Sequence, residues 1–268
     1  MPDIAISLRH VTRRFYPKKG PPLTAVEDVT LDIPTGTFLS IVGPSGCGKS
    51  TLLGMISGLQ AADAVEVMIR GQAVRDVQRE VGFLFQREAL LPWKTVLDNV
   101  MLALMFRGAS TSSARDAARS WIARVGLSGF EGYYPHQLSG GMRKRVQLAQ
   151  ALVYDPPILL MDEPFSALDV QTRNLMENDL LGLWSEHSKT VVFITHDLEE
   201  AVALSDRVVV MTASPGRVKA AYDVDLPRPR NVTEVRFQPE FGRIYAQLWA
   251  DLRDEVLLSY ERSKLSAQ

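Results

Sequence analysis

The sequence predicts an α/β protein built on a mainly parallel sheet. Three continuous apolar runs have the length and the β-branched content of strands buried on both faces: residues 156–164, 190–197 and 207–214. Amphipathic segments with the three- and four-residue spacing of helices lie between them, at 173–187 and 198–205. Buried strands that alternate with helices are typical of parallel sheets whose two faces are covered.

The elements before these runs are shorter. Period-two alternation of apolar residues predicts strands at 4–11, 29–33 and 38–43, and a fourth strand with a glycine turn at 65–74. From Trp93 to about Val125 the spacing becomes helical. Two helices are expected there, at 95–106 and 114–127, separated by a loop of small polar residues at 107–113.

The C-terminal part begins with a proline-rich joint at 225–231. After Pro239 the apolar residues Phe241, Ile244, Leu248, Leu252 and Val256 follow at three- and four-residue steps. This spacing predicts an amphipathic helix that packs one face against the rest of the protein.

The composition narrows the class of protein. With 268 residues, 46% hydrophobic and 23% charged, the chain suits one large globular domain or one domain with appendages. A net charge of −1 gives no overall attraction to nucleic acid. Its apolar runs are far shorter than the ~18–20 residues of a membrane-spanning helix, and its first residues lack a secretory pattern. We therefore expect a cytoplasmic protein with no nucleic-acid partner.

A glycine-rich loop indicates a phosphate site. Residues 43–51, GPSGCGKST, match G-x-x-x-x-G-K-[ST] between an expected strand and an expected helix. Such glycines let backbone N–H groups turn toward phosphate oxygens, and the helix N-terminus favours the same anion. The residues expected to bind the nucleotide here are Gly43, Pro44, Ser45, Gly46, Cys47, Gly48, Lys49, Ser50 and Thr51. Lys49 would reach the outer phosphates and Ser50 would ligate Mg²⁺, the alternative being a structural glycine turn.

Cys47 is the one cysteine of the chain, which excludes an internal disulfide. A helix N-terminus lowers a thiol pKa, so its position in the loop predicts thiolate character. Two interpretations stay open. Cys47 is a small spacer, or its alkylation blocks nucleotide binding.

Two adjacent carboxylates, Asp162 and Glu163, end the run 156–164. Successive side chains of a strand point to opposite faces, so we expect the two acids to have different roles. Asp162 is the candidate that holds Mg²⁺ through its water shell, and Glu163 the candidate that positions or deprotonates an attacking water. The alternative is a solvated acidic strand end.

Two further polar residues follow apolar strands. His196 ends the strand at 190–197, at the edge where parallel sheets bind ligands, and is a candidate to contact a phosphate and orient the water. Gln86 ends a short apolar segment, and its amide is a candidate contact for Mg²⁺ or the water. A structural role is the alternative for both.

The segment LSGGMRKRVQLAQAL, residues 138–152, combines a serine and two glycines with a basic helix, yet contains no carboxylate, histidine or cysteine. Ser139, Gly140 and Gly141 begin this helix, whose N–H groups and dipole suit an anion. An ordinary helix start with a serine cap is the alternative.

The phosphate loop, Gln86, LSGG, ILLMDEP, SALD and His196 occur in the order seen in ATP-binding-cassette (ABC) ATPases, and residues 4 to about 216 resemble this family. The resemblance implies a P-loop (RecA-like) core with an N-terminal antiparallel β subdomain and an inserted helical subdomain. The implied ranges are 4–225 for the ATPase domain, about 87–154 for the helical subdomain and 226–268 for a helical extension. Met142 replaces the more usual glutamine.

The resemblance also implies a composite site. Two cassettes, a homodimer or a heterodimer, would pack head to tail around two ATP molecules with Mg²⁺. Each ATP would lie on the phosphate loop of one chain and under Ser139–Gly141 of the other. Phe15 or Tyr16 looks like the aromatic that stacks on adenine, although an aromatic at a strand end is often a core residue. Ser166 and Asp169 of SALD look like the loop that meets the partner.

The phrases MDEPFSALD, THDLEEAVALSDRVVVM and TASPGRV resemble the importer branch for nitrate, sulfonate, taurine and related solutes. That branch implies separate transmembrane permease subunits, indirectly a solute-binding protein, and a peripheral place on the cytoplasmic face of the inner membrane. A cassette ATPase without a transport role is the alternative. A plain P-loop switch or kinase would leave LSGG and SALD unexplained.

Overall fold

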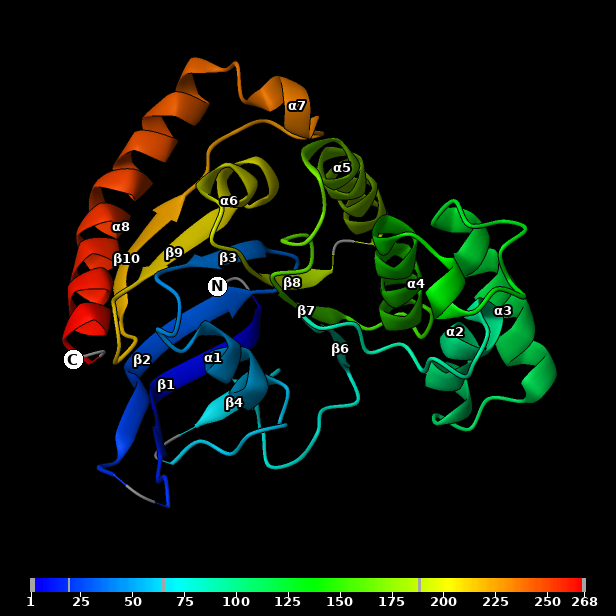
Figure 1. Ribbon diagram of the computed structural model, residues 1–268, viewed down its shortest axis with the longest axis horizontal. Helices are drawn as coiled ribbons and strands as arrows, with labels where there is room; N and C mark the ends of the chain where they lie inside the picture. The colour runs from blue at the N-terminus through cyan, green and yellow to red at the C-terminus, as the bar shows by residue number, and fades with distance from the viewer. Residues whose placement is uncertain (1–2, 19, 64–65, 188, 267–268) are drawn as a thin grey trace.

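The computed structural model describes residues 3–18, 20–63, 66–187 and 189–266. Two sheets and a set of helices form the fold, with α2, α3 and α4 gathered to one side and α8 along the opposite edge (Figure 1). The mixture of a mainly parallel sheet with an antiparallel sheet confirms the predicted α/β class.

The smaller sheet is antiparallel and has the strand order β2-β1-β4-β5. Its strands are β1 (Ile4–Phe15), β2 (Leu23–Pro34), β4 (Val67–Ile69) and β5 (Gln72–Ala73). The first two are longer than the alternation predicted, because their outer halves are partly exposed and carry polar residues that hide the period. The predicted strand at 65–74 is divided in two by a turn at Arg70 and Gly71, and Val65 lies outside the described residues.

The larger sheet has the order β10-β9-β3-β8-β7-β6 and is parallel except for its edge strand β10. Its strands are β3 (Phe38–Val42), β6 (Val81–Leu84), β7 (Ile158–Asp162), β8 (Thr190–Ile194), β9 (Arg207–Met211) and β10 (Val218–Asp223). The three predicted buried runs are its central strands. The strand β10 was not predicted, because its side chains are half-buried or exposed, as edge strands allow.

Every residue of β3, β7 and β8 is buried, because the large sheet is covered on both faces. In β3 the side chains alternate between two apolar clusters. Phe38 and Val42 pack in one with the residues of α5 and α6, whereas Leu39 and Ile41 pack in the other with α1 and the antiparallel sheet. This arrangement holds α1 and the loop before it between the two sheets.

The helices are α1 (Lys49–Ile56), α2 (Val96–Met105), α3 (Thr111–Arg124), α4 (Gly140–Leu152), α5 (Val170–His187), α6 (Leu198–Leu204), α7 (Val232–Val235) and α8 (Pro239–Ser266). The second predicted helix begins earlier than expected, at Thr111. Ser110 caps it by accepting a hydrogen bond from the Ser113 N–H (3.3 Å). Among the residues described, no helix has the length and apolarity needed to cross a membrane.

The C-terminal helix α8 packs back against α6, β9 and β10 (Figure 1). Phe241, Ile244, Leu248 and Leu252 are buried as the spacing predicted. The prediction for Val256 is wrong, since its side chain is 42% exposed. Its neighbour Glu255 is buried instead and accepts a hydrogen bond from the Ala213 N–H (2.8 Å).

Candidate active site

The glycine-rich loop joins β3 to α1 and requires glycine at two positions. Gly46 and Gly48 have φ angles of +76° and +99°, which L side chains rarely adopt. Gly48 is also packed tightly, because a Cβ there would lie 2.6 Å from the Ala25 carbonyl oxygen and 2.8 Å from Val26 Cγ2. Together these constraints hold the loop against β2 in one conformation.

Lys49 is 6% exposed and lies across this loop. Its Nζ donates hydrogen bonds to the carbonyl oxygens of Gly43 (2.8 Å) and Pro44 (3.0 Å). A third, longer contact joins Nζ to Cys47 Sγ (3.9 Å). Because no carboxylate is bound to it in the described chain, the ammonium is placed to attract phosphate oxygens.

Asp162 lies at the carboxyl end of β7, beside the start of α1. Burial raises the pKa of its carboxyl group, opposed by a hydrogen bond from the Ser50 hydroxyl and by the charge of Lys49. Of the three residues predicted to contact Mg²⁺, Ser50 and Asp162 therefore lie close enough to interact, and Gln86 contacts Glu163 instead. Within the described residues, no cluster of three or more metal-ligating acids, histidines or cysteines is found.

Glu163 directly follows β7 and leaves the strand geometry. Its φ is +44°, and its N–H donates to the Ile194 carbonyl oxygen (3.0 Å). Strand alternation was predicted to direct Asp162 and Glu163 to opposite faces. It does not extend to Glu163, because this residue lies past the strand end and its left-handed backbone sets the direction of its side chain. Non-glycine residues with positive φ are uncommon and concentrate at functional sites.

Three predicted residues meet at one oxygen atom. Glu163 Oε2 accepts a hydrogen bond from Gln86 Nε2 (3.1 Å) and lies 3.3 Å from His196 Nδ1. The Glu163 side chain is largely buried, whereas that of His196 is more than half exposed. The strand ends of β6, β7 and β8 are adjacent in the sheet, which explains why residues 77 and 33 positions apart come together.

The LSGG turn begins α4 as predicted. Ser139 is the N-cap residue, and its hydroxyl accepts a hydrogen bond from the Met142 N–H (3.3 Å). Gly141 contacts α5, since a Cβ there would lie 2.8 Å from Thr172 Cγ2. In the described part of the chain no hydrogen bond or ion pair joins Ser139, Gly140 or Gly141 to the phosphate loop. The structure therefore does not bring these two predicted nucleotide contacts together within one chain.

The helix α4 instead holds the segment that follows Gln86. Lys144 is buried and its Nζ donates to the Gln86 carbonyl oxygen (3.1 Å). Arg143 Nε pairs with Glu88 (2.7 Å) and Gln147 Nε2 donates to the Arg87 carbonyl oxygen (3.4 Å). The contact of Lys144 with Gln86 was not predicted, since a lysine on a basic helix carries no signal of burial.

The candidate aromatic residues lie at the end of β1. Phe15 pairs with Leu23 of β2, the strand whose Ala25 and Val26 contact Gly48. The Phe15 ring is partly exposed beneath the Arg13 guanidinium (5.1 Å to the centroid), and Tyr16, which follows β1, is 71% exposed. Phe15 thus belongs to the strand pair that supports the phosphate loop, and Tyr16 directly follows it.

The prediction of thiolate character for Cys47 is wrong. Its side chain is buried, and burial raises the pKa of the thiol more than Lys49 lowers it. The spacer interpretation fits this environment.

Asp169 caps α5 by accepting a hydrogen bond from the Thr172 N–H (3.0 Å), which lowers the pKa of its carboxyl group. Ser166 donates to the Glu163 carbonyl oxygen (3.1 Å). Arg173, not singled out from the sequence, binds both the Leu168 carbonyl oxygen (3.3 Å) and Asp197 (3.1 Å). It therefore connects the SALD loop to the loop that carries His196.

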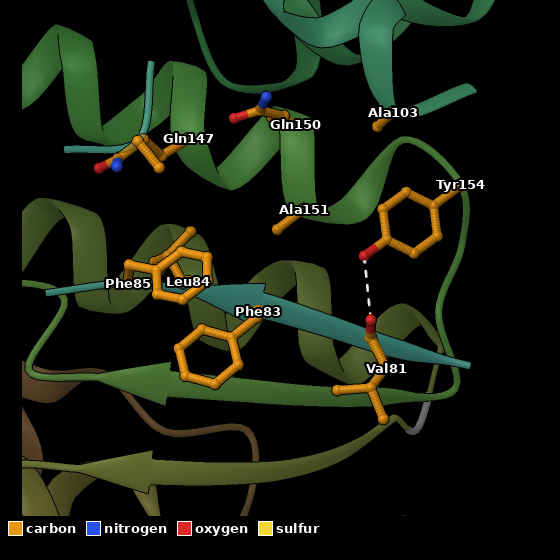
Figure 2. Close-up of a pocket in the computed structure, with 10 residues that line it drawn as sticks. Val81, Phe83, Leu84, Phe85, Ala103, Gln147, Gln150, Ala151 and Tyr154 are labelled. Carbon is orange, nitrogen blue, oxygen red and sulfur yellow. Dashed lines mark hydrogen bonds between the residues drawn. The ribbon is translucent and has the colours of Figure 1, made fainter. Parts of the chain in front are cut away.

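A groove of about 260 Å³ lies between β6 and α4, next to Gln86. Figure 2 shows Phe83, Leu84 and Phe85 on one side, with Gln150 and Tyr154 on the other. The Tyr154 hydroxyl closes one end by donating to the Val81 carbonyl oxygen (3.2 Å). The groove therefore has an aromatic wall, at Phe83 and Phe85, that leads directly to the residue that contacts Glu163.

Comparison with known proteins agrees with this geometry. Residues 26–166 match the family model described as ABC transporter. The chain is 44% identical to an uncharacterized ABC transporter ATP-binding protein of Methanocaldococcus jannaschii, over 96% of this chain and 94% of the relative. It is 37% identical to the aliphatic sulfonates import ATP-binding protein SsuB of Bacillus anthracis, over 98% of each.

Among solved structures, the fold is similar to an ATP-binding cassette in a dimeric, post-hydrolysis state bound to ADP and Pi. The TM-score is 0.74 with 36% identity, over 83% of this chain and all of the other. A second dimeric structure of a bacterial ABC transporter cassette has a TM-score of 0.75 with 34% identity, over the same shares of both chains. The family match covers more than half of the chain and the relatives nearly all of it, so this protein belongs to the ABC transporter family as an ATP-binding subunit.

Proposed function

We propose that this chain is the ATP-hydrolysing subunit of an ABC importer. It would couple ATP binding and hydrolysis in a head-to-tail dimer to uptake of a small solute through separate permease subunits. The observation that carries the proposal is the contact of Gln86 and His196 with Glu163, one residue beyond the Asp162–Ser50 pair.

The phosphate loop would bind the triphosphate through its backbone N–H groups and Lys49. The positive φ of Gly46 and Gly48 supports this assignment, since such backbones form concave anion sites. We propose that Phe15 or Tyr16 stacks on the adenine, because both extend from the strand pair packed on the loop.

Mg²⁺ fits the oxygen donors at this site. Ser50 and Asp162 would hold it together with phosphate oxygens, with Gln86 as a further candidate, since magnesium is usually bound by one or two carboxylates rather than by an all-protein cage. When bound, the ion would neutralise charge that develops on the phosphates. The contact between Ser50 and Asp162 supports this role.

We assign the positioning or deprotonation of water to the Glu163 carboxylate, with its Oε2 as the acceptor. Gln86 and His196 hold this oxygen from two sides, so its direction is set before any substrate arrives. The exposed face of His196 is free to contact a terminal phosphate.

The partner chain would complete the site. Ser139–Gly141 presents a capped helix start without a link to its own phosphate loop, which supports a role toward the nucleotide of a second cassette. Asp169, in the loop between Glu163 and α5, would meet the same partner. The dimeric state of the two similar cassettes agrees with this arrangement.

The groove beside Gln86 would receive a helix of the permease. Its aromatic floor and its position next to Gln86 give a direct path from a docked helix to Glu163. The subunit would then lie on the cytoplasmic face of the inner membrane, and a separate solute-binding protein would choose the cargo. Similarity to the sulfonate import proteins supports nitrate, sulfonate, taurine or a related compound as that cargo.

The first test measures how the rate of ATP hydrolysis depends on dimer assembly. ATP turnover per chain should rise with protein concentration and vanish when single chains are kept apart by dilution, because each chain holds half of each site. Turnover per chain that is independent of concentration would contradict the dimer. Recovery of tagged protein with membrane-embedded subunits would support transport, whereas recovery without them would favour a cassette ATPase that has no transport role.

A further inference from the structure

A second cavity lies far along the chain from the phosphate loop, between α5 and the proline-rich joint that leads into α7. Its volume is about 570 Å³, within the range of small-molecule sites. The lining residues are Asn178, Leu181, Gly182, Trp184, Ser185, Arg228, Pro229, Arg230 and Asn231. Figure 1 shows α5 and α7 side by side at this end of the molecule, and the two helices are in contact.

The cavity lining carries more positive than negative charge. Arg228 binds Asp206 through Nε (2.9 Å) and Nη2 (2.7 Å). Arg230 is buried and its guanidinium donates only to backbone carbonyl oxygens, including those of Ser205 (2.6 Å) and Leu226 (2.9 Å). Asp206 therefore pairs with Arg228, whereas Arg230 has no carboxylate at hydrogen-bond distance among the described residues.

The environment of Arg230 strengthens this imbalance. Burial lowers its pKa to about 10, so the group remains a cation at neutral pH. Its Nε is buried and has no hydrogen-bond partner within the described residues. No aspartate or glutamate lines the cavity. A buried cation without its own counter-ion makes a favourable place for an anion.

Some hydrogen-bond donors of the cavity lining have no partner in the described part of the chain. Arg228 uses Nε and Nη2, whereas its Nη1 has no partner in the described part of the chain. Asn178 also lines the cavity: its Oδ1 accepts from the Val232 N–H (2.9 Å), whereas its amide nitrogen donates no hydrogen bond within the described residues. An oxyanion head matches these N–H groups.

The remaining wall is apolar. Leu181, Trp184 and Pro229 line it, and the Arg228 guanidinium lies 4.1 Å from the Trp184 ring centre. We propose that this cavity is a binding site for an amphipathic organic anion, with its oxyanion head on Arg228 and Arg230 and its apolar body along α5. Neither the cassette chemistry nor the family match assigns this site.

The test is calorimetric titration of the full chain with hexanesulfonate, which is ionised at every working pH. We expect one site per chain with a Kd of about 1 mM or tighter. Hexanol should not bind, and inorganic sulfate should bind about tenfold more weakly. Hexanol binding as tight as hexanesulfonate, or no heat with hexanesulfonate, would overturn the proposal.

Two variants localise the binding. Gly182→Leu adds a side chain where a Cβ meets nothing within 4 Å, so it should fill the cavity without strain and weaken binding at least about tenfold. Gly242→Leu is the matched control, since Gly242 is a helical glycine of α8 with the same open space. Binding by Gly182→Leu equal to that by Gly242→Leu would place the ligand elsewhere.

The charge requirement is tested separately. Arg228→Gln should weaken hexanesulfonate binding at least about tenfold, whereas Arg228→Lys should retain part of it. Lys49→Ala should bind hexanesulfonate as the unmodified chain does, because the phosphate loop is a different anion site. Loss of binding in Lys49→Ala, with binding kept in Arg228→Gln, would assign the anion to the phosphate loop and end the proposal.

Discussion

Gly216 lies against the backbone of Cys47, so close that a Cβ at position 216 would stand 1.9 Å from the Cys47 carbonyl oxygen. The Gly216 N–H donates to the Ala25 carbonyl oxygen (2.9 Å), and its own carbonyl accepts from the Glu27 N–H (3.0 Å). The loop after β9 thereby joins β2 to the phosphate loop. The segment PGRV, residues 215–218, which resembles an importer branch in sequence, therefore also has a structural role.

We therefore expect Gly216→Ala to disturb the phosphate loop. The added methyl group has to displace the Cys47 carbonyl, an overpacking that costs about 1–3 kcal/mol of the free energy of unfolding. Nucleotide affinity should fall in parallel, as measured by calorimetric titration with ATP. Gly242→Ala is the control, since its Cβ meets nothing and alanine favours a helix interior. Equal stability of the two variants would contradict the contact.

Glu163→Gln should keep ATP binding and lose turnover by about 10²–10³-fold, equivalent to ~2.7–4 kcal/mol of barrier. The amide keeps the size of the side chain but cannot accept a proton from water. ATP-bound dimers should accumulate, which gel filtration with Mg-ATP measures. Glu240→Gln on α8, remote from the phosphate loop in the sequence and paired with Arg243, serves as control. Turnover by Glu163→Gln at the unmodified rate would show that the base is elsewhere.

Lys49→Ala should weaken ATP binding at least about tenfold, because the ammonium on the loop carbonyls supplies attraction to the outer phosphates. Equilibrium titration with ATP measures the affinity. Lys94→Ala provides the comparison, since Lys94 makes no ion pair in the described chain. Undiminished affinity in Lys49→Ala would refute the role given to this lysine.

Lys144→Met should slow hydrolysis more than it weakens ATP binding. The substitution keeps the length of the buried side chain but leaves the Gln86 carbonyl without its hydrogen bond, so the amide that contacts Glu163 is held less firmly. Steady-state kinetics separate the two effects: kcat should fall while KM for ATP changes little. An unchanged kcat would show that α4 does not position Gln86.

The burial of the Glu177 carboxyl group leads us to expect that the stability of the protein falls as pH rises. Its side chain is fully buried on α5, facing Glu200 of α6 together with Arg173 and Arg236. Burial, followed by the charge of Glu200, raises its pKa from 4.5 to about 9. The folded protein therefore binds a proton that the unfolded chain releases, and this stabilisation is present below pH 4.5 and lost as pH rises toward 9.

Glu177→Gln should accordingly reduce the loss of stability between pH 6 and pH 9, as measured by guanidinium unfolding at each pH. Glu240→Gln is the matched control. Arg243 lowers the pKa of Glu240, so its contribution is complete above its unfolded value and does not change in this range. A slope for Glu177→Gln equal to that of the control would show that Glu177 is ionised in the folded protein.

Sequence patterns determined the elements that are either fully buried or chemically constrained. The strands β7, β8 and β9 were predictable because burial on both faces demands continuous apolar residues. The phosphate loop was predictable because left-handed backbone at Gly46 and Gly48 demands glycine. The edge strand β10 was not, since exposed strands tolerate almost any side chain. The outer half of β2 was not either, since its buried Ala25 and Val26 are flanked by polar residues.

Only the tertiary structure decided how the candidate groups meet. The sequence placed Gln86, Glu163 and His196 at three strand ends, but the order of β6, β7 and β8 in the sheet and the left-handed backbone of Glu163 bring them to one oxygen. The burial of Lys144 and Glu177 and the approach of Gly216 to Cys47 leave no local signature. Local patterns record what each segment needs, whereas contacts between distant segments depend on how those segments pack.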